Sequence, residues 1–259
     1  MTDTSTNALF IITSATNAPY TEISGRDTAN NDNKAACNGA SASSNTSDGS
    51  GQSVPSYDNL MATIYSINTH APGSRIALVE YSAYPLSQPQ HNALIEHVDY
   101  LMSYSGNEQI QRLDRQLRSS QAIASFSELT CLMWFLQVGQ HHDLYKSFNR
   151  VFKISPGVQL LAPPADTVHF SDNAKGRYVF PNATLAANAT GALALQFSNK
   201  YWSMDAELVP SFIALLQQML QAMHELNEQG QAVSVPSMLY KFIDAGKIFY
   251  DLKPNVTGQ

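Results

Sequence analysis

The sequence predicts an α/β fold in which a mixed, mostly parallel sheet is flanked by helices, and three observations support this. Between Leu9 and Ser82, a buried strand, a long polar insertion, an amphipathic helix and a second buried strand follow one another. A third buried apolar run covers 150–154, and the part from 205 to 259 is mainly helical in pattern. Since strand–helix–strand units form right-handed parallel crossovers, this order predicts a Rossmann-like sheet.

The first crossover is the clearest part of the pattern. Residues Ala8 to Thr13 form a continuous apolar run that is closed by Ser14 and a turn at Asn17, as in a strand buried on both faces. Apolar positions recur every three or four residues from 57 to 67, which predicts a helix. A second buried run, 75–79, then leads into Glu80.

The remaining elements follow from the same two periodicities. We expect helices around 94–102 and 122–138, and a third buried strand at 150–154. Two further runs, 176–180 and 193–197, are predicted to extend the sheet. Apolar residues spaced as a helical stripe run from Leu208 to Leu226, and another helix begins near Met238.

We expect the 259 residues, 44% of them hydrophobic, to form a single α/β domain covering 1–259. Residues 26–53 interrupt it with a low-complexity insertion of small and polar residues, which predicts a flexible loop. That loop is either a neutral surface insertion or a lid over the strand ends.

Composition argues against several functional classes. A net charge of −6 and the lack of a Lys/Arg block disfavour nucleic acid or an anionic membrane as the main partner. Two cysteines do not support a disulfide framework or a zinc site. We find no stretch of about 20 apolar residues typical of a transmembrane segment, and expect a cytoplasmic protein.

Polar residues gather where the predicted strands end. The carboxyl ends of parallel strands share one edge of the sheet, which is where ligands of such folds bind. Thr13, Ser14 and Asn17 would line the end of the first strand, and Glu80 the end of the second. Glu128 lies near the start of an apolar helix, either capping it towards solvent or facing this cleft.

Several short strings, taken in order, resemble a group of bacterial and large-virus proteins regarded as nucleotide-sugar-dependent glycosyltransferases of the GT-A type. The matching segments are Phe10–Ser14, the predicted helix from Tyr57 to Ile67, Ile76–Glu80, Ser127–Leu129, Val151–Ser155 and Tyr201–Met204. In that group the third strand runs into a Gly-Arg-Tyr element, whereas here this triplet occurs downstream at 176–178. No Asp-x-Asp pair follows a strand, so the sequence names no metal ligands.

The resemblance implies a GT-A-like fold, a nucleotide-sugar donor, a glycan or other hydroxyl acceptor, and a role in polysaccharide biosynthesis. The departing diphosphate would be neutralised by Mn²⁺ or Mg²⁺, or by Lys153, Lys175 and Arg177. Glu128 or Asp172 would act as the base for the acceptor hydroxyl. The nucleoside would meet Thr13, Ser14, Asn17 and, through its ribose, Glu80.

Two other functional classes remain open at this point. The chain is alternatively a protein that binds a nucleotide or sugar through a degenerate transferase fold without transferring it. It is otherwise an assembly protein that uses the stripe from Leu208 to Leu226 as a partner surface. A Rossmann oxidoreductase is disfavoured, because no Gly-x-Gly-x-x-Gly follows the first strand.

Overall fold

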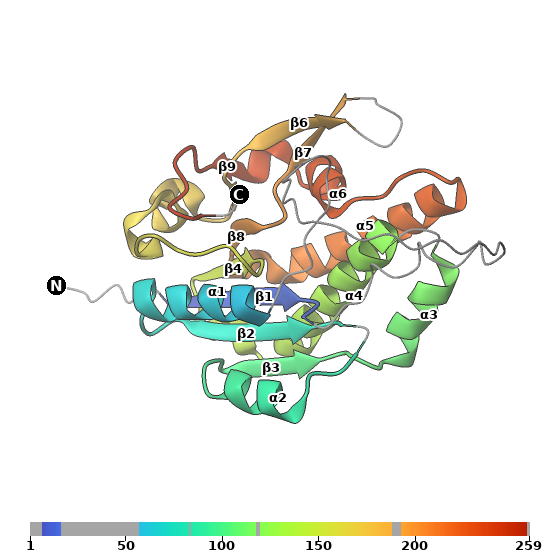
Figure 1. Cartoon of the computed structure of the whole chain (residues 1–259). Helices are drawn as coiled ribbons and strands as arrows, with labels where there is room; N and C mark the ends of the chain where they lie inside the picture. Colours follow the sequence, from blue (N-terminus) through green and yellow to red (C-terminus); the bar gives the residue numbers. More distant parts are fainter. Residues whose placement is uncertain (1–6, 17–56, 83, 118–119, 188–192, 258–259) are drawn as a thin grey trace, which may run out of the picture.

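A seven-stranded sheet forms the centre of the computed structural model, which describes residues 7–16, 57–82, 84–117, 120–187 and 193–257 (Figure 1). The strand order is β3-β2-β1-β4-β8-β5-β9. The strands are β1 (Ala8–Ser14), β2 (Arg75–Glu80), β3 (Tyr100–Ser103), β4 (Arg150–Ile154), β5 (Tyr178–Phe180), β8 (Tyr201–Asp205) and β9 (Ile248–Tyr250).

Strand direction divides the sheet into two parts. Strands β3, β2, β1 and β4 are parallel neighbours, so their carboxyl ends share one edge. Strand β8 is antiparallel to both β4 and β5, and β9 pairs in parallel with β5. The mixed, mostly parallel sheet of the predicted fold class is therefore confirmed.

Helices cover both faces of this sheet. The helices are α1 (Tyr57–His70), α2 (Gln88–Ile95), α3 (Glu108–Gln116), α4 (Ser120–His141), α5 (Val209–Glu228) and α6 (Val235–Phe242). One core layer joins α1 and α2 to side chains such as Phe10 and Phe152. The opposite layer joins α3, α4, α5 and α6 to side chains such as Leu9 and Val151. Strand alternation sends neighbouring residues of β1 and β4 to opposite layers.

The strongest sequence patterns predict their elements correctly, and the weaker ones need correction. The predicted helix around 94–102 is wrong, because α2 ends at Ile95 and Tyr100–Ser103 forms the edge strand β3. The run 193–197 does not extend the main sheet, since it is strand β7 (Leu193–Phe197) of a separate hairpin with β6 (Ala183–Ala187). The insertion 26–53 lies outside the described residues.

Two long helices in the second core layer bear on the sequence expectations. Gln121–His141 of α4 is long and apolar enough to cross a membrane by length and composition, contrary to what we expected of the sequence. In this fold it packs against β1, β2 and α5. The apolar stripe of α5 also faces the core, with Phe212, Met219 and Met223 fully buried. That stripe is therefore already covered by the chain itself.

Candidate functional site at the carboxyl edge of the sheet

A buried ion pair lies at the shared carboxyl edge of β1 and β4. Lys153 Nζ is 2.7 Å from Glu128 Oε1, and the two side chains are 3% and 11% exposed. Thr13 Oγ1 donates to the same carboxylate oxygen at 2.9 Å. Thr13 and Lys153 point towards the face covered by α4, and Glu128 reaches them from that helix. Glu128 therefore faces into the fold at this edge instead of capping its helix towards solvent.

The ammonium group of Lys153 is fully engaged by protein groups. Besides Glu128, it donates to Ser155 Oγ at 2.6 Å and to the backbone carbonyl of Asn199. The Asn199 side chain also contacts Glu128, with its Nδ2 3.4 Å from Oε2. The segment after β7 thus closes over the pair, and Oε2 is the less engaged oxygen of the carboxylate.

Glu80, at the end of β2, holds together the two loops that follow β1 and β2. It is fully buried and accepts hydrogen bonds from the Thr16 amide at 3.0 Å and the Thr16 hydroxyl at 2.8 Å. The Ser82 amide, at 3.1 Å, and the Ser82 hydroxyl donate to it as well. Ser14 Oγ lies 2.8 Å from Thr16 Oγ1 and joins this network. Burial raises the pKa of Glu80, and the four hydrogen bonds oppose that rise.

The structure brings together only some of the residues that the sequence suggested. Thr13, Ser14, Glu80, Glu128 and Lys153 all lie at the carboxyl edge of the parallel strands. Asn17 lies outside the described residues.

The other three predicted residues, Lys175, Arg177 and Asp172, lie away from this group, at the opposite edge of the sheet. The amide of Gly176 donates to Asp205 Oδ2 at 2.9 Å. Asp205 is the register partner of Arg150, the first residue of β4, in the antiparallel pairing of β8 with β4. The chain enters β5 at this edge because β5 runs antiparallel to β8. All three side chains are exposed there.

The described residues at the carboxyl edge do not by themselves form a site for a divalent metal ion. Among the described residues, no three carboxylate, His or Cys side chains are grouped closely enough to hold one. Both oxygens of Glu80 accept hydrogen bonds, and the Lys153 ammonium already stands beside Glu128 as its cation. The described donors at this edge are thus one carboxylate neutralised by an ammonium, one carboxylate engaged by four hydrogen bonds, and hydroxyl groups, which leaves no free carboxylate of the kind that binds Mg²⁺ together with water and substrate phosphates.

A second buried polar network, which sequence reasoning missed, crosses the antiparallel half of the sheet. Arg150 Nε donates to Ser203 Oγ at 2.6 Å, and Ser203 Oγ lies 2.6 Å from His169 Nδ1. His169 Nε2 is 3.4 Å from Asp251 Oδ2. Ser203 is fully buried and already bound by Arg150, so this Ser-His-Asp group is structural. The one sequence signal was a charged residue, Arg150, opening an apolar strand.

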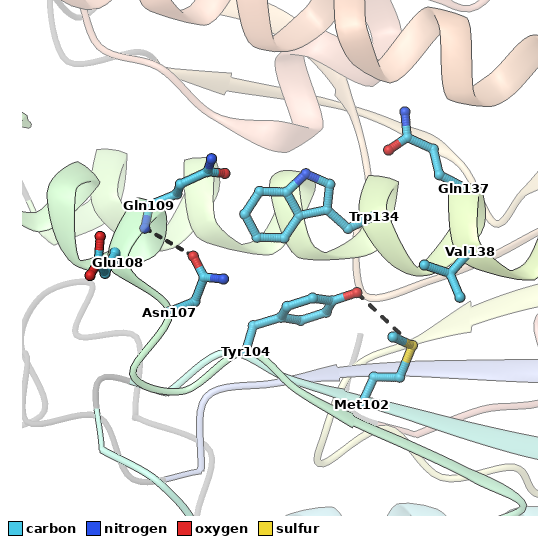
Figure 2. A pocket seen from close by; sticks show the side chains of 8 residues that line it. All are labelled: Met102, Tyr104, Asn107, Glu108, Gln109, Trp134, Gln137 and Val138. Carbon is cyan, nitrogen blue, oxygen red and sulfur yellow. Dashed lines mark hydrogen bonds between the residues drawn. The ribbon is translucent and has the colours of Figure 1, made fainter.

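An open cleft of about 540 Å³ lies beside the same carboxyl edge, between the end of β3, the start of α3 and the outer side of α4 (Figure 2). Tyr104 and Trp134 form its centre, with ring centroids 5.3 Å apart and ring planes at 53°. The Tyr104 amide donates to the carbonyl of Glu80 at 2.8 Å, which ties the cleft to the end of β2. Burial raises the pKa of Tyr104 to about 12.

Comparison with known proteins identifies the fold. No protein-family model matches the chain, and no curated protein matches it. Among solved structures, core-mannan synthase A of Aspergillus fumigatus in its Mn/GDP form matches with a TM-score of 0.50 and 12% identity, over 96% of this chain and 74% of that one. The mannosyltransferase Ktr4p of S. cerevisiae matches with a TM-score of 0.52 and 10% identity, over 78% and 67%. The fold is that of GT-A glycosyltransferases.

Proposed function

We propose that this protein is a nucleotide-sugar-dependent glycosyltransferase that transfers a sugar to a hydroxyl group of a glycan or similar acceptor. The observation that supports this most is the buried Thr13–Glu128–Lys153 cluster, which stands at the ligand-binding edge of a GT-A fold. The solved structures with this fold include a mannosyltransferase and a synthase in an Mn/GDP form.

Glu128 is the base in this proposal. The acceptor hydroxyl forms a new bond to the anomeric carbon of the donor, while the bond from that carbon to the diphosphate breaks and its electron pair leaves with the diphosphate. The hydroxyl proton passes to Glu128 Oε2, the oxygen whose partner Asn199 Nδ2 lies as far as 3.4 Å away. Lys153 and Thr13 hold the carboxylate in place through Oε1.

Glu80 acts as a positioning residue in this scheme. Its four hydrogen bonds to Thr16 and Ser82 fix the loops that border the first and second strand ends. A donor nucleoside would therefore contact the loops that Glu80 shapes, while the buried hydroxyls of Thr13 and Ser14 support the site from beneath through Glu128 and Thr16. Loss of Glu80 then weakens donor binding through the loops.

A second function, binding of a nucleotide or sugar without transfer, is favoured by one observation. Lys153 has its three donors engaged by protein acceptors, and Lys175 and Arg177 lie at the opposite edge. Within the described part of the chain, the carboxyl edge thus offers no unengaged cation from the predicted set for a leaving diphosphate. A protein with this arrangement would retain affinity for its ligand while turnover is lost.

One experiment separates the two functions. The melting temperature is measured with a panel of nucleoside diphosphates and sugar nucleotides, with and without Mn²⁺, and nucleoside diphosphate release is then measured with the sugar nucleotides that bind. Ligand at 100 times its Kd stabilises the native state by about 2.7 kcal/mol, or roughly 5–11 °C for a chain of this size.

The variant Glu128→Gln tests the base. We expect it to keep the thermal shift and to lower turnover by about 10²–10⁴-fold. The control Glu96→Gln, which changes an exposed carboxylate just after the end of α2, should keep both. Binding without turnover in the unmodified protein supports the second function. If a well-folded sample is stabilised by none of these ligands, both the transferase and nucleotide binding without transfer are refuted.

A further inference from the structure

The cleft in Figure 2 has the composition of a sugar-binding surface, and we propose that it binds an uncharged saccharide. Under the proposed function this saccharide is the acceptor glycan, so that name rests on the proposal above, while the binding itself does not. The location of the cleft supports the assignment. The Tyr104 amide donates to the carbonyl of Glu80, so the cleft lies next to the carboxyl edge that carries the candidate site.

The aromatic pair provides the apolar part of the site. Tyr104 and Trp134 are both partly exposed, and their tilted rings stand side by side at the centre of the cleft (Figure 2). The C–H face of a sugar ring packs on such aromatic surface, which is large, rigid and carries a polar edge. The Tyr104 hydroxyl has Met102 Sδ, a weak acceptor at 4.0 Å, as its partner.

Unengaged amides around the rings provide the polar part. Gln109 lies to one side of the aromatic pair and Gln137 to the other, and within the described part of the chain neither side chain has a hydrogen-bond partner. Asn107 uses its Oδ1 to accept from the amides of Gln109 and Ile110, which leaves its Nδ2 to donate. Amides offer donors and acceptors together, and sugar hydroxyls need both.

Aromatic rings and amides can bind either saccharides or nucleotides, and the charge of the residues that line the cleft distinguishes the two. None of the eight described residues that line the cleft is positively charged, and one of them, Glu108, is acidic. Phosphate groups require cations or clustered N–H donors, so a nucleotide does not match this lining. The tilt of 53° between the rings also leaves no parallel slot for a base. A neutral, polyhydroxylated ligand matches both the rings and the amides.

Trp134 makes the proposal directly measurable. The chain contains two tryptophans, and the other, Trp202, is 3% exposed in the core, so a saccharide in the cleft should change the fluorescence of Trp134. The probes are mannotriose, maltotriose, cellotriose and chitotriose, titrated without nucleotide, with calorimetry as a second readout. We expect at least one to bind saturably with a Kd of about 1 mM or lower.

Three variants locate the binding. Trp134→Ala should weaken the Kd at least about tenfold, as truncation of a central aromatic anchor does. Gln137→Ala, a surface change on α4 that leaves the aromatic pair intact, should weaken it about three- to tenfold. The control Tyr65→Ala removes a ring that is 50% exposed on α1, on the other face of the sheet, and should leave binding unchanged.

Three results would overturn the proposal. The first is that the folded protein binds none of the trisaccharides, and the second is that Trp134→Ala and Gln137→Ala bind them as tightly as the unmodified protein. The third is that the cleft binds tetramethylammonium, a probe for cations on aromatic faces, and not the saccharides. The failure of this proposal and the failure of the proposed transferase function can be told apart. Trp134-dependent saccharide binding without nucleotide stabilisation would keep the cleft and remove the transferase, and the converse would keep the transferase and remove the cleft.

Discussion

Replacing Lys153 with Met should destabilise the protein strongly, because it leaves the Glu128 carboxylate buried without its cation. Breaking a buried ion pair by removing one partner costs about 3–5 kcal/mol. Here Nζ and Oε1 are 2.7 Å apart, with side chains 3% and 11% exposed. Since Thr13 still donates to the carboxylate in the variant, we expect the lower end, about 3 kcal/mol.

Urea unfolding followed by circular dichroism measures this loss, and it corresponds to a melting temperature roughly 6–12 °C lower for a chain of this size. The double variant Lys153→Met/Glu128→Leu should regain most of it, because an apolar pair can replace a buried ion pair at little cost. The matched control is Lys146→Met. Lys146 pairs with Asp143 at 2.9 Å, but both side chains are more than half exposed, so we expect a change of about 0–1 kcal/mol.

The reasoning is refuted by either of two results. One is a cost for Lys153→Met no larger than that for Lys146→Met. The other is a double variant as unstable as the single one, which would mean that the uncompensated charge of Glu128 is not the source of the loss. In the second case Lys153 would contribute to the fold mainly through its bonds to Ser155 and Asn199.

Two more predictions concern stability. Burial lowers the pKa of His169, so as pH falls below about 6.5 the unfolded chain binds a proton at this residue before the native state does. Burial raises the pKa of its neighbour Asp251, but hydrogen bonds from His169 and the Lys253 amide outweigh that rise, so the pKa of Asp251 lies below 3.8 and Asp251 stays ionised above pH 5. The free energy of unfolding should therefore fall as pH drops from 7 to 5, by at most about 1.4 kcal/mol per pH unit for one proton. Urea unfolding across this range should show a smaller dependence of that free energy on pH for His169→Gln, but not for the exposed control His224→Gln. Gly139→Ala should lower the free energy of unfolding by about 1–3 kcal/mol, although Ala has the better helix propensity, because a Cβ there would lie 2.7 Å from Cζ of the buried Tyr145. A melting temperature at or above that of the unmodified protein would contradict this.

The parts of the fold that the sequence predicts are those buried on both sides. All seven residues of β1 and all five of β4 are buried, so their apolar runs are continuous and easily recognised. Strand β3 escaped recognition because it is short, lies at the edge and is half exposed, and its Leu101 and Met102 continue the helical spacing from Leu94. Its identity comes from pairing with β2, which is a tertiary contact.

Which predicted residues share the site depends on whether each one precedes or follows its strand. The residues that follow β1, β2 and β4 were placed correctly at one edge, since crossovers make these strands parallel. Lys175 and Arg177 lie at the other edge because they precede β5 and do not follow it, and β5 runs in the same direction as β4, so its start lies at the amino edge of the sheet. The residues that line the cleft around Trp134 come from three segments of the chain, so no spacing within the sequence predicts it.

The position of β1 between β2 and β4 has a consequence for how the chain is made. Strand β1 is synthesised well before β4, so one of its two edges stays open until residues 150–154 emerge. At about 5–20 residues per second, that wait lasts roughly 7–30 s. During it, the nascent chain carries an apolar strand with unpaired backbone groups, the kind of edge that recruits other chains. Fragments that stop short of β4 would keep this edge permanently, so the amino-terminal crossover is poorly suited to exist as an independent piece.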